Sequence, residues 1–234
     1  YYNNVVNTLN LLKTMRKYNC DKIIFSSSCA TYGEPLYTPI DENHVQNPIN
    51  PYGKSKHMIE NILEDFSTAY DLKYISLRYF NAAGADLDLE IGEKHTPETH
   101  LIPLLLDAAL GRSKDFKIFG SNYNTKDGTC IRDFIHVNDL AQAHLLSLQS
   151  LLNNRKSDIF NLGTGVGYSI LDVIKAVEEI TSSAILTEIQ NRRGGDPAIL
   201  VASSDKISKE LKWEPSLSDL NLIIQSAFRW HKKL

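Results

Sequence analysis

The sequence has 234 residues, of which 42% are hydrophobic and 23% are charged, and its formal net charge is -3. These values are typical of a soluble globular protein with one large domain or two small ones. The slight acidity argues against a general nucleic-acid binder, and no apolar run is long enough to cross a bilayer, so we expect neither nucleic acid nor a membrane as a partner.

The first eighty residues alternate between helical and strand patterns. The opening segment repeats four apolar residues at helical spacing, namely Val5, Leu9, Leu12 and Met15. We then expect a buried strand over 21–28, a loop rich in glycine and proline, a long helix over 52–70 and a second strand over 73–80. This order indicates an α/β protein with a parallel sheet and crossover helices. Because no helix start signal precedes the first helix, we expect the chain to begin in mid-fold.

The pattern changes after residue 80, where 81–100 is polar and irregular. Further elements are expected at 101–110 (helix), 116–120 (strand), 132–148 (a strand-like piece and a helix that Asn138 could cap), 158–165 (strand and turn), 169–181 (a helix with Ser169 and Asp172 at its start) and 217–233 (helix). We therefore predict a sheet-based lobe over 1–80 and a smaller mixed lobe over 81–234, with about 130–150 returning to the first.

Tyr52 and Lys56 lie four residues apart in "PYGKSK", which places them on one face of the expected helix. A free phenol has a pKa of about 10, too high for a base at neutral pH. A nearby ammonium favours the phenolate, and a tyrosinate can take a proton from an alcohol. The pattern alone is common by chance, and Lys56 could equally reach water from the first turn.

Ser28 lies at the end of the strand predicted over 21–28. Ligands of parallel α/β sheets bind at the carboxyl ends of the strands, where a hydroxyl could bind a substrate oxygen and relay a proton to Tyr52. The alternative is a simple turn of polar residues.

These residues together resemble the extended short-chain dehydrogenase/reductases and, more closely, their UDP-glucose 4-epimerase subgroup. The resemblance covers nearly the whole chain. Its blocks follow the family's order: "IIFSSSCATYGE", "NPYGKSK", "LRYFNAAGA", "GTCIRDFIHVNDLAQAH", "FNLGTGVGYSILDVI" and "RRGGDPAILVA".

The resemblance implies a Rossmann-like parallel sheet, N-terminally incomplete in this chain, followed by a smaller mixed α/β substrate lobe. It implies NAD as cofactor and Ser28, Tyr52 and Lys56 as catalytic residues, with Asn3 and Phe80 also at the cofactor. The implied substrate-binding residues are Asn81, His100, Leu101, Lys117, Ile118, Phe119, Arg132, Arg193, Asp196 and Leu200. His100 departs from the family's asparagine. The residue at the Leu200 position gates the sugar's 2-substituent in the family, which suggests tolerance of N-acetylated sugars here.

The resemblance implies the activity of a UDP-sugar 4-epimerase, which interconverts UDP-glucose and UDP-galactose by NAD-dependent oxidation at carbon 4 of the sugar. The implied assembly is a homodimer that pairs through the first helix and the helix from Tyr52. One alternative is a nucleotide-sugar 4,6-dehydratase, but Cys29, Ala30 and Thr31 stand where those relatives carry an acidic pair. The other is a noncatalytic fragment, because no G-x-x-G-x-x-G turn follows a first strand. We accordingly expect weak NAD binding by this chain alone.

Three cysteines, Cys20, Cys29 and Cys130, fit neither a disulfide framework nor a zinc site in number and spacing. We therefore expect no metal and a reducing, cytoplasmic location.

Overall fold

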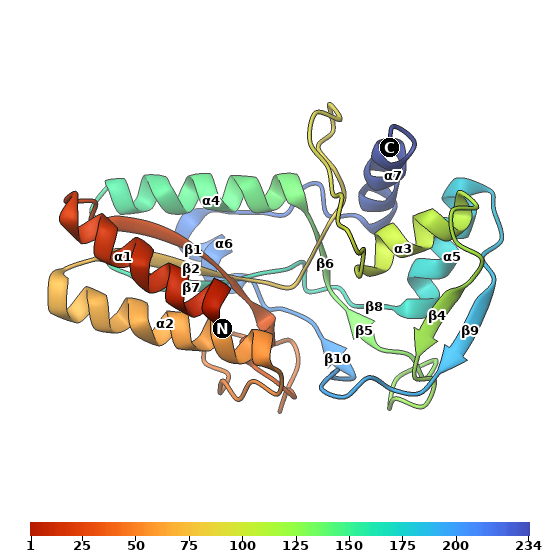
Figure 1. Cartoon of the computed structure of the whole chain (residues 1–234), viewed down its shortest axis with the longest axis horizontal. Coiled ribbons are helices and arrows are strands. Elements are labelled where there is room, and N and C mark those ends of the chain that lie inside the picture. The colour runs from red at the N-terminus through yellow and green to blue at the C-terminus, as the bar shows by residue number, and fades with distance from the viewer.

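The computed structural model describes residues 1–234 and divides them into two groups of elements that lie side by side along the longest axis (Figure 1). The helices are α1 (Asn7–Lys17), α2 (Pro51–Tyr70), α3 (Leu101–Ala109), α4 (Val137–Leu152), α5 (Ile170–Thr181), α6 (Asp205–Leu211) and α7 (Leu220–His231). A π-helical turn, Tyr2–Val6, leads into α1, and a 3₁₀ turn, Cys29–Thr31, follows β1.

The strands are short outside the first group. They are β1 (Lys22–Ser28), β2 (Lys73–Tyr79), β3 (Asn81–Ala83), β4 (Phe116–Phe119), β5 (Ile131–Arg132), β6 (Phe134–His136), β7 (Asp158–Leu162), β8 (Tyr168–Ser169), β9 (Thr187–Gln190) and β10 (Ile199–Leu200). β1, β2 and β7 form a parallel sheet in that order, which confirms the predicted α/β class.

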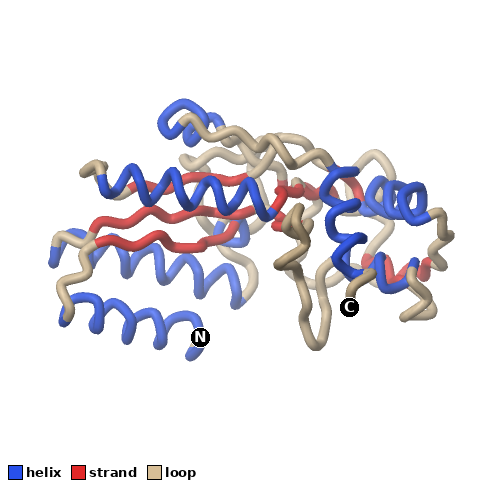
Figure 2. Tube along the Cα trace, turned by 90° about the horizontal axis from the view of Figure 1, so that it is seen from above, coloured by secondary structure: helices blue, strands red, loops and turns tan.

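The two faces of this sheet are covered by different helices, as Figures 1 and 2 show. Successive residues of a strand point to opposite faces. Tyr74 of β2 accordingly packs with α1 and α2, whereas Ile75 and Leu77 pack with α4 and with Trp213. The sheet is therefore a buried middle layer between helices, as a parallel sheet requires.

The start of α2 is fixed by local chemistry. Asn50 caps the helix, because its Oδ1 accepts a hydrogen bond from the Gly53 N–H at 2.8 Å, and Pro51 occupies the first turn. A Cβ on Gly53 would lie 2.2 Å from the carbonyl oxygen of Ala30, so only glycine lets the helix approach the turn after β1 this closely. The first turn of α2 thus lies beside the carboxyl end of β1.

A buried ion pair fastens α2 to the sheet. Glu60 of α2 accepts two hydrogen bonds from the Arg78 guanidinium of β2, at 3.0 and 2.7 Å, and one from the Ser27 hydroxyl of β1 at 2.6 Å. Burial by itself would raise the pKa of the Glu60 carboxyl, but these donors outweigh it and the pKa lies below its ordinary value. The carboxylate is therefore the favoured form at neutral pH.

The second group contains α3, α5 and α7 around the largest apolar cluster. Its strands pair as β3 with β6, β4 with β9, and β5 with β8 and β10. Ser169 and Asp172 lie at the start of α5, as predicted, and the structure shows that they form a capping box there. The predicted cap of α4 is wrong: the helix begins two residues earlier, and its N-cap is His136, whose ring accepts a hydrogen bond from the Asn138 N–H at 3.1 Å.

Part of the chain after residue 80 returns to the first sheet. α4 covers one face of it, β7 pairs with β2, and α6 packs on β7. The return thus includes α4, β7 and α6, whereas β5 and β6 pair within the second group, and the division at residue 80 stays a prediction. Separately, the helices include none that combines the length and the apolarity of a membrane span.

We predict that Arg78→Met lowers the free energy of unfolding by about 3–5 kcal/mol, because it leaves the Glu60 carboxylate buried without its partner. Urea unfolding followed by circular dichroism measures the change. Lys73→Met on the same strand is the matched control, since the ion pair of Lys73 with Asp71 is exposed and its loss should hardly move the midpoint. Equal midpoint shifts for both variants would contradict the assigned role of the buried pair.

Candidate active site

The largest cavity, of about 730 Å³, opens where β1 and β2 end. Ser28, Tyr52 and Phe80 line it together with Asn81 and Leu200. Its size lies in the range of small-molecule sites, and its position matches the ligand end of a parallel sheet. The fold therefore presents a ligand site at the edge where the sequence predicted one.

The structure brings the predicted trio close together, with Ser28 and Tyr52 in the lining of this cavity and Lys56 beside Tyr52 but outside the lining. Ser28 is buried at the end of β1, and its Oγ accepts a hydrogen bond from the Ala30 N–H at 3.2 Å. Tyr52 is half-exposed in the first turn of α2. Lys56 lies one turn later, with its Nζ 5.7 Å from the centre of the Tyr52 ring. The strand end and the helix start thus supply a hydroxyl, a phenol and an ammonium to one place.

The electrostatics of Tyr52 differ from the expectation. Partial burial raises the pKa of its phenol above the ordinary value of 10.0, and a hydrogen bond with Ser28 opposes this only in part. Burial also lowers the pKa of Lys56. The expected lowering of the phenol pKa by Lys56 is not found in this chain, because the ammonium donates to the Ser26 carbonyl oxygen, at 2.8 Å, instead of to the phenol.

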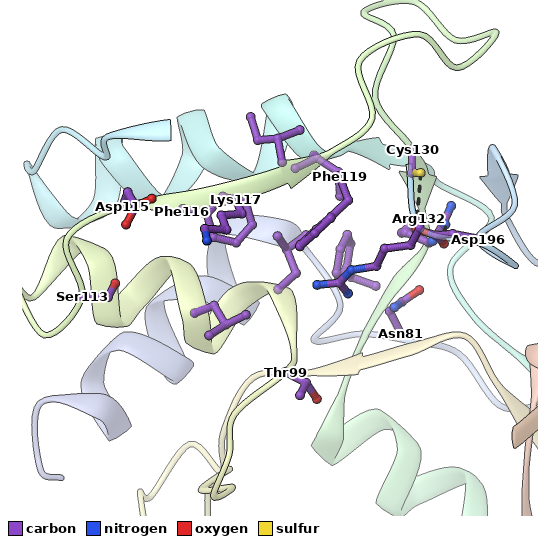
Figure 3. A pocket seen from close by; sticks show the side chains of 16 residues that line it. Asn81, Thr99, Ser113, Asp115, Phe116, Lys117, Phe119, Cys130, Arg132 and Asp196 are labelled. Atoms are coloured by element: carbon purple, nitrogen blue, oxygen red, sulfur yellow. Dashed lines mark hydrogen bonds and ion pairs between the residues drawn. The ribbon is translucent and has the colours of Figure 1, made fainter. Parts of the chain in front are cut away.

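A second cavity of about 390 Å³ lies between β4, α3 and β5. Figure 3 shows Asn81, Arg132 and Asp196 at one end of it and Ser113, Asp115 and Lys117 at the other. Other predicted residues that line it are Leu101, Ile118, Phe119 and Arg193. Asn81 and Arg132 line both cavities, so the two form one elongated site.

Two arginine side chains line the second cavity. The guanidinium of Arg193 lies over the Phe119 ring, 3.7 Å from its centre. The guanidinium of Arg132 is buried, pairs with Asp196 and donates to the Pro197 carbonyl oxygen at 2.7 Å. A planar cation beside an aromatic ring suits a ligand with phosphate groups and a base.

Two predicted site residues, Asn3 and His100, differ in their position relative to the large cavity. Asn3 is exposed and does not line the cavity, whereas its neighbour Asn4 donates to the Ser55 hydroxyl at 2.9 Å and so contacts the helix of Tyr52. His100 lines the large cavity at the start of α3 and is paired with Glu93. The place of Asn3 at the cofactor stays a prediction without support from its position.

Sequence reasoning missed several residues of the cavity wall. They are Cys29, Tyr79, Ala82, Val137, Asn138 and Ala141 from four different elements, and Glu93 and His95 from the loop before α3. Only Cys29, Tyr79 and Ala82, each next to a predicted site residue, carried a signal that could have found them.

A hydroxyl, a phenol and an ammonium near the carboxyl edge of a parallel sheet, with a second cavity alongside that two arginines line, are the arrangement of an enzyme of the short-chain dehydrogenase/reductase class. Comparison with known proteins agrees and is more specific. The family described as "NAD dependent epimerase/dehydratase family" matches residues 1–163. The chain belongs to this family and, within it, to the UDP-glucose 4-epimerases.

Three similar proteins illustrate the relationship. UDP-glucose 4-epimerase of Halalkalibacterium halodurans is 49% identical over 233 residues, which are 100% of this chain and 70% of that protein. The crystal structure of UDP-glucose 4-epimerase from Brucella ovis in complex with NAD is 47% identical, with a TM-score of 0.94 over 98% of this chain and 70% of that one. The UDP-Glc/GlcNAc 4-epimerase of Campylobacter jejuni is 44% identical, with a TM-score of 0.82 over 100% and 71%.

We predict that Ser28→Ala moves the ionisation of Tyr52 to still higher pH, because it removes the hydrogen bond that favours the phenolate. The measurement is a pH titration by NMR of protein with ¹³Cζ-labelled tyrosine, in which Tyr52→Phe identifies the signal. Ser183→Ala, away from the cavity, should leave the titration unchanged. A Tyr52 titration that stays in place or moves to lower pH in Ser28→Ala would refute the contact.

Proposed function

We propose that this chain catalyses the reversible 4-epimerisation of UDP-glucose and UDP-galactose with NAD as the bound cofactor. The observation that carries the proposal is that Ser28 and Tyr52 line one cavity at the carboxyl edge of β1, with Lys56 one helical turn beyond Tyr52 and hydrogen-bonded to the Ser26 carbonyl oxygen. The family membership and the names of the relatives support the same reaction. The dehydratase is not favoured, because Cys29, Ala30 and Thr31 include no carboxylate that could help to remove water.

The residues at the cavity fit the reacting end of such a cofactor. The Lys56 ammonium carries three N–H donors and makes one hydrogen bond, to Ser26, so two donors remain for a polyhydroxylated ligand. When bound, NAD would supply reversible hydride transfer at carbon 4 of the sugar.

Tyr52 is the proposed base and acid. Its phenol takes the proton of the sugar's 4-hydroxyl as the hydride leaves, and later returns it. Because burial raises the pKa of this phenol, the phenolate needs nearby positive charge, which Lys56 and an oxidised nicotinamide would both supply. Ser28 hydrogen-bonds the reacting oxygen and the phenol, and so shortens the path of the proton.

The second cavity is the proposed nucleotide site. Arg193 and Arg132 bind the diphosphate, Asn81 lies at the junction with the sugar, and Asp196 binds a ribose hydroxyl. The remaining wall residues, Leu101, Lys117, Ile118 and Phe119, surround the uracil, and Phe80 and His100 contact the ligands in the larger cavity. A firmly held nucleotide lets the 4-keto sugar rotate about its link to UDP and present its other face.

Leu200 is the proposed gate for the sugar's 2-substituent. It is 8% exposed, packs with Phe80 and lines the cavity of Tyr52. Leucine leaves more room than a tyrosine would, and a relative with 44% identity is named for both UDP-Glc and UDP-GlcNAc. We therefore include UDP-N-acetylhexosamines among the proposed substrates.

The proposed assembly is a homodimer formed through α1 and α2. The two helices lie next to each other on one side of the molecule (Figure 1) and leave Leu11 and Met58 exposed, at 51% and 45%. A cytoplasmic location is also proposed, in keeping with three free cysteines, Cys20, Cys29 and Cys130.

Tyr52→Phe should reduce kcat by roughly 10²–10⁴-fold, because it removes the group that transfers the proton while keeping the ring. The assay follows conversion of UDP-galactose to UDP-glucose by the NAD-loaded enzyme. Tyr70→Phe, at the other end of the same helix, is the control and should retain full activity. A dehydrated 4-keto-6-deoxy product would instead establish the dehydratase, and full activity of Tyr52→Phe would refute the mechanism.

Leu200→Tyr should abolish most turnover of UDP-N-acetylgalactosamine, by roughly 10-fold or more, and largely spare UDP-galactose, because only the bulkier 2-substituent meets the new ring. Ratios of kcat/KM for the two substrates give the measurement. Leu36→Tyr serves as the control, since Leu36 is 79% exposed. No turnover of the N-acetylated sugar by the unmodified enzyme would remove this idea.

A further inference from the structure

Four side chains that can bind a metal converge in the loop between β3 and α3. Glu93, His95, Glu98 and His100 each offer one ligand atom, and these atoms all lie within 4.8 Å of one another. Both imidazoles use Nδ1: that of His95 lies 3.0 Å from a Glu93 oxygen and 3.6 Å from Glu98, and that of His100 lies 3.5 Å from Glu98 and is in contact with Glu93.

These separations are close to those of a metal coordination sphere. Zinc binds imidazole nitrogen and carboxylate oxygen at about 2.0–2.1 Å in a tetrahedron, whose edges are therefore about 3.3 Å. The measured separations fall on both sides of that edge. The four ligand atoms lie within 4.8 Å of one another, so an ion at the centre of the group would draw the more distant ones together.

The sequence explains how the four ligands meet. Glu93 and His95 are two residues apart, as are Glu98 and His100, so the unit Glu-x-His occurs twice in "EKHTPETH". In extended backbone, residues two apart point to the same side. Two such units that face each other place a carboxylate and an imidazole from each on a shared centre.

Hydrogen bonds of the backbone hold the Glu98 carboxylate and the main chain at Glu93 in place. The backbone N–H groups of Thr99 and His100 donate to one oxygen of Glu98, at 2.7 and 2.9 Å. The Trp230 indole of α7 donates to the Glu93 carbonyl oxygen at 2.9 Å, and Gly92 packs against the same ring. Such outer contacts are what orient the ligands of a metal site.

Charge and exposure indicate the kind of ion. Two carboxylates balance a divalent cation, and two imidazoles favour zinc and similar transition metals over magnesium or calcium. The side chains of Glu93 and Glu98 are 19% and 13% exposed, whereas those of His95 and His100 are 54% and 62% exposed. The ion can therefore enter from solvent past the two imidazoles.

We propose that Glu93, His95, Glu98 and His100 form a binding site for one zinc-class divalent cation. Three of these residues, Glu93, His95 and His100, also line the cavity that contains Tyr52. The ion would thus cross-link the loop that protrudes beside α7 in Figure 1 and fix that wall of the cavity.

The test is direct binding of metal by the whole chain, after removal of bound ions with EDTA. Calorimetry with Zn²⁺ should give one ion per chain, and Co²⁺ should produce the visible absorption bands of a tetrahedral site. All proteins carry Cys20→Ser, because Cys20 is an exposed thiol that could bind metal by itself. The measurement needs no enzymatic activity, so its result is separate from that of the proposed reaction.

Glu93→Gln and His95→Ala should each weaken Zn²⁺ binding by roughly 100-fold or more and remove the Co²⁺ bands, because each deletes one ligand. Glu90→Gln, in the same loop and outside the group, is the matched control and should bind as the parent does. His95 is exposed, so its loss should leave the fold intact by circular dichroism. No stoichiometric binding by the parent, or unchanged affinity in both ligand variants, would overturn the site and leave four side chains that only hydrogen-bond one another.

Discussion

The buried pair of Glu60 and Arg78 is the interaction on which the geometry of the site depends. Tyr52 and Lys56 belong to α2 and Ser28 belongs to β1, so the trio exists only while the helix keeps its position on the sheet. Glu60 lies one turn beyond Lys56 and binds residues of both β1 and β2. Because apolar contacts alone tolerate sliding, a charged pair with several fixed hydrogen bonds sets the register between helix and strand.

The same arrangement explains why the chain alone does not present an activated base. A helix packed this closely on a strand end withdraws Tyr52 from water, and the loss of solvent favours the neutral phenol. The lysine expected to offset this is bound to a backbone carbonyl of β1. The phenol is therefore a latent base, whose ionisation awaits additional positive charge in the cavity. Because Tyr52 is partly buried, the pKa of its phenol depends on whether a positively charged ligand occupies the cavity.

The sequence predicted those features that depend on neighbours along the chain. The parallel sheet, the bounds of α2 and the start of α5 follow from periodicity and caps. Features that depend on distant segments were missed. The pair of Glu60 with Arg78 joins residues 18 apart, the two-residue strands β5, β8 and β10 have no periodicity, and Asn4 contacts Ser55 across 51 residues. The group of Glu93, His95, Glu98 and His100 was not predicted, because its members meet only through the path of a loop without helix or strand.

The two cavities divide the demands of the proposed reaction between them. A sugar must turn over between the two hydride transfers, so tight binding of the sugar itself would slow the enzyme, whereas binding of the nonreacting nucleotide costs nothing in rotation. The smaller cavity is rich in fixed contacts, with Arg132 held by Asp196 and Arg193 over Phe119. The larger one, around Tyr52, is roomier and has apolar walls such as Phe80 and Leu200. Specific binding of the nucleotide and free rotation of the sugar can coexist because each takes place in a different cavity. Asn81 and Arg132 line both cavities and therefore lie at their junction.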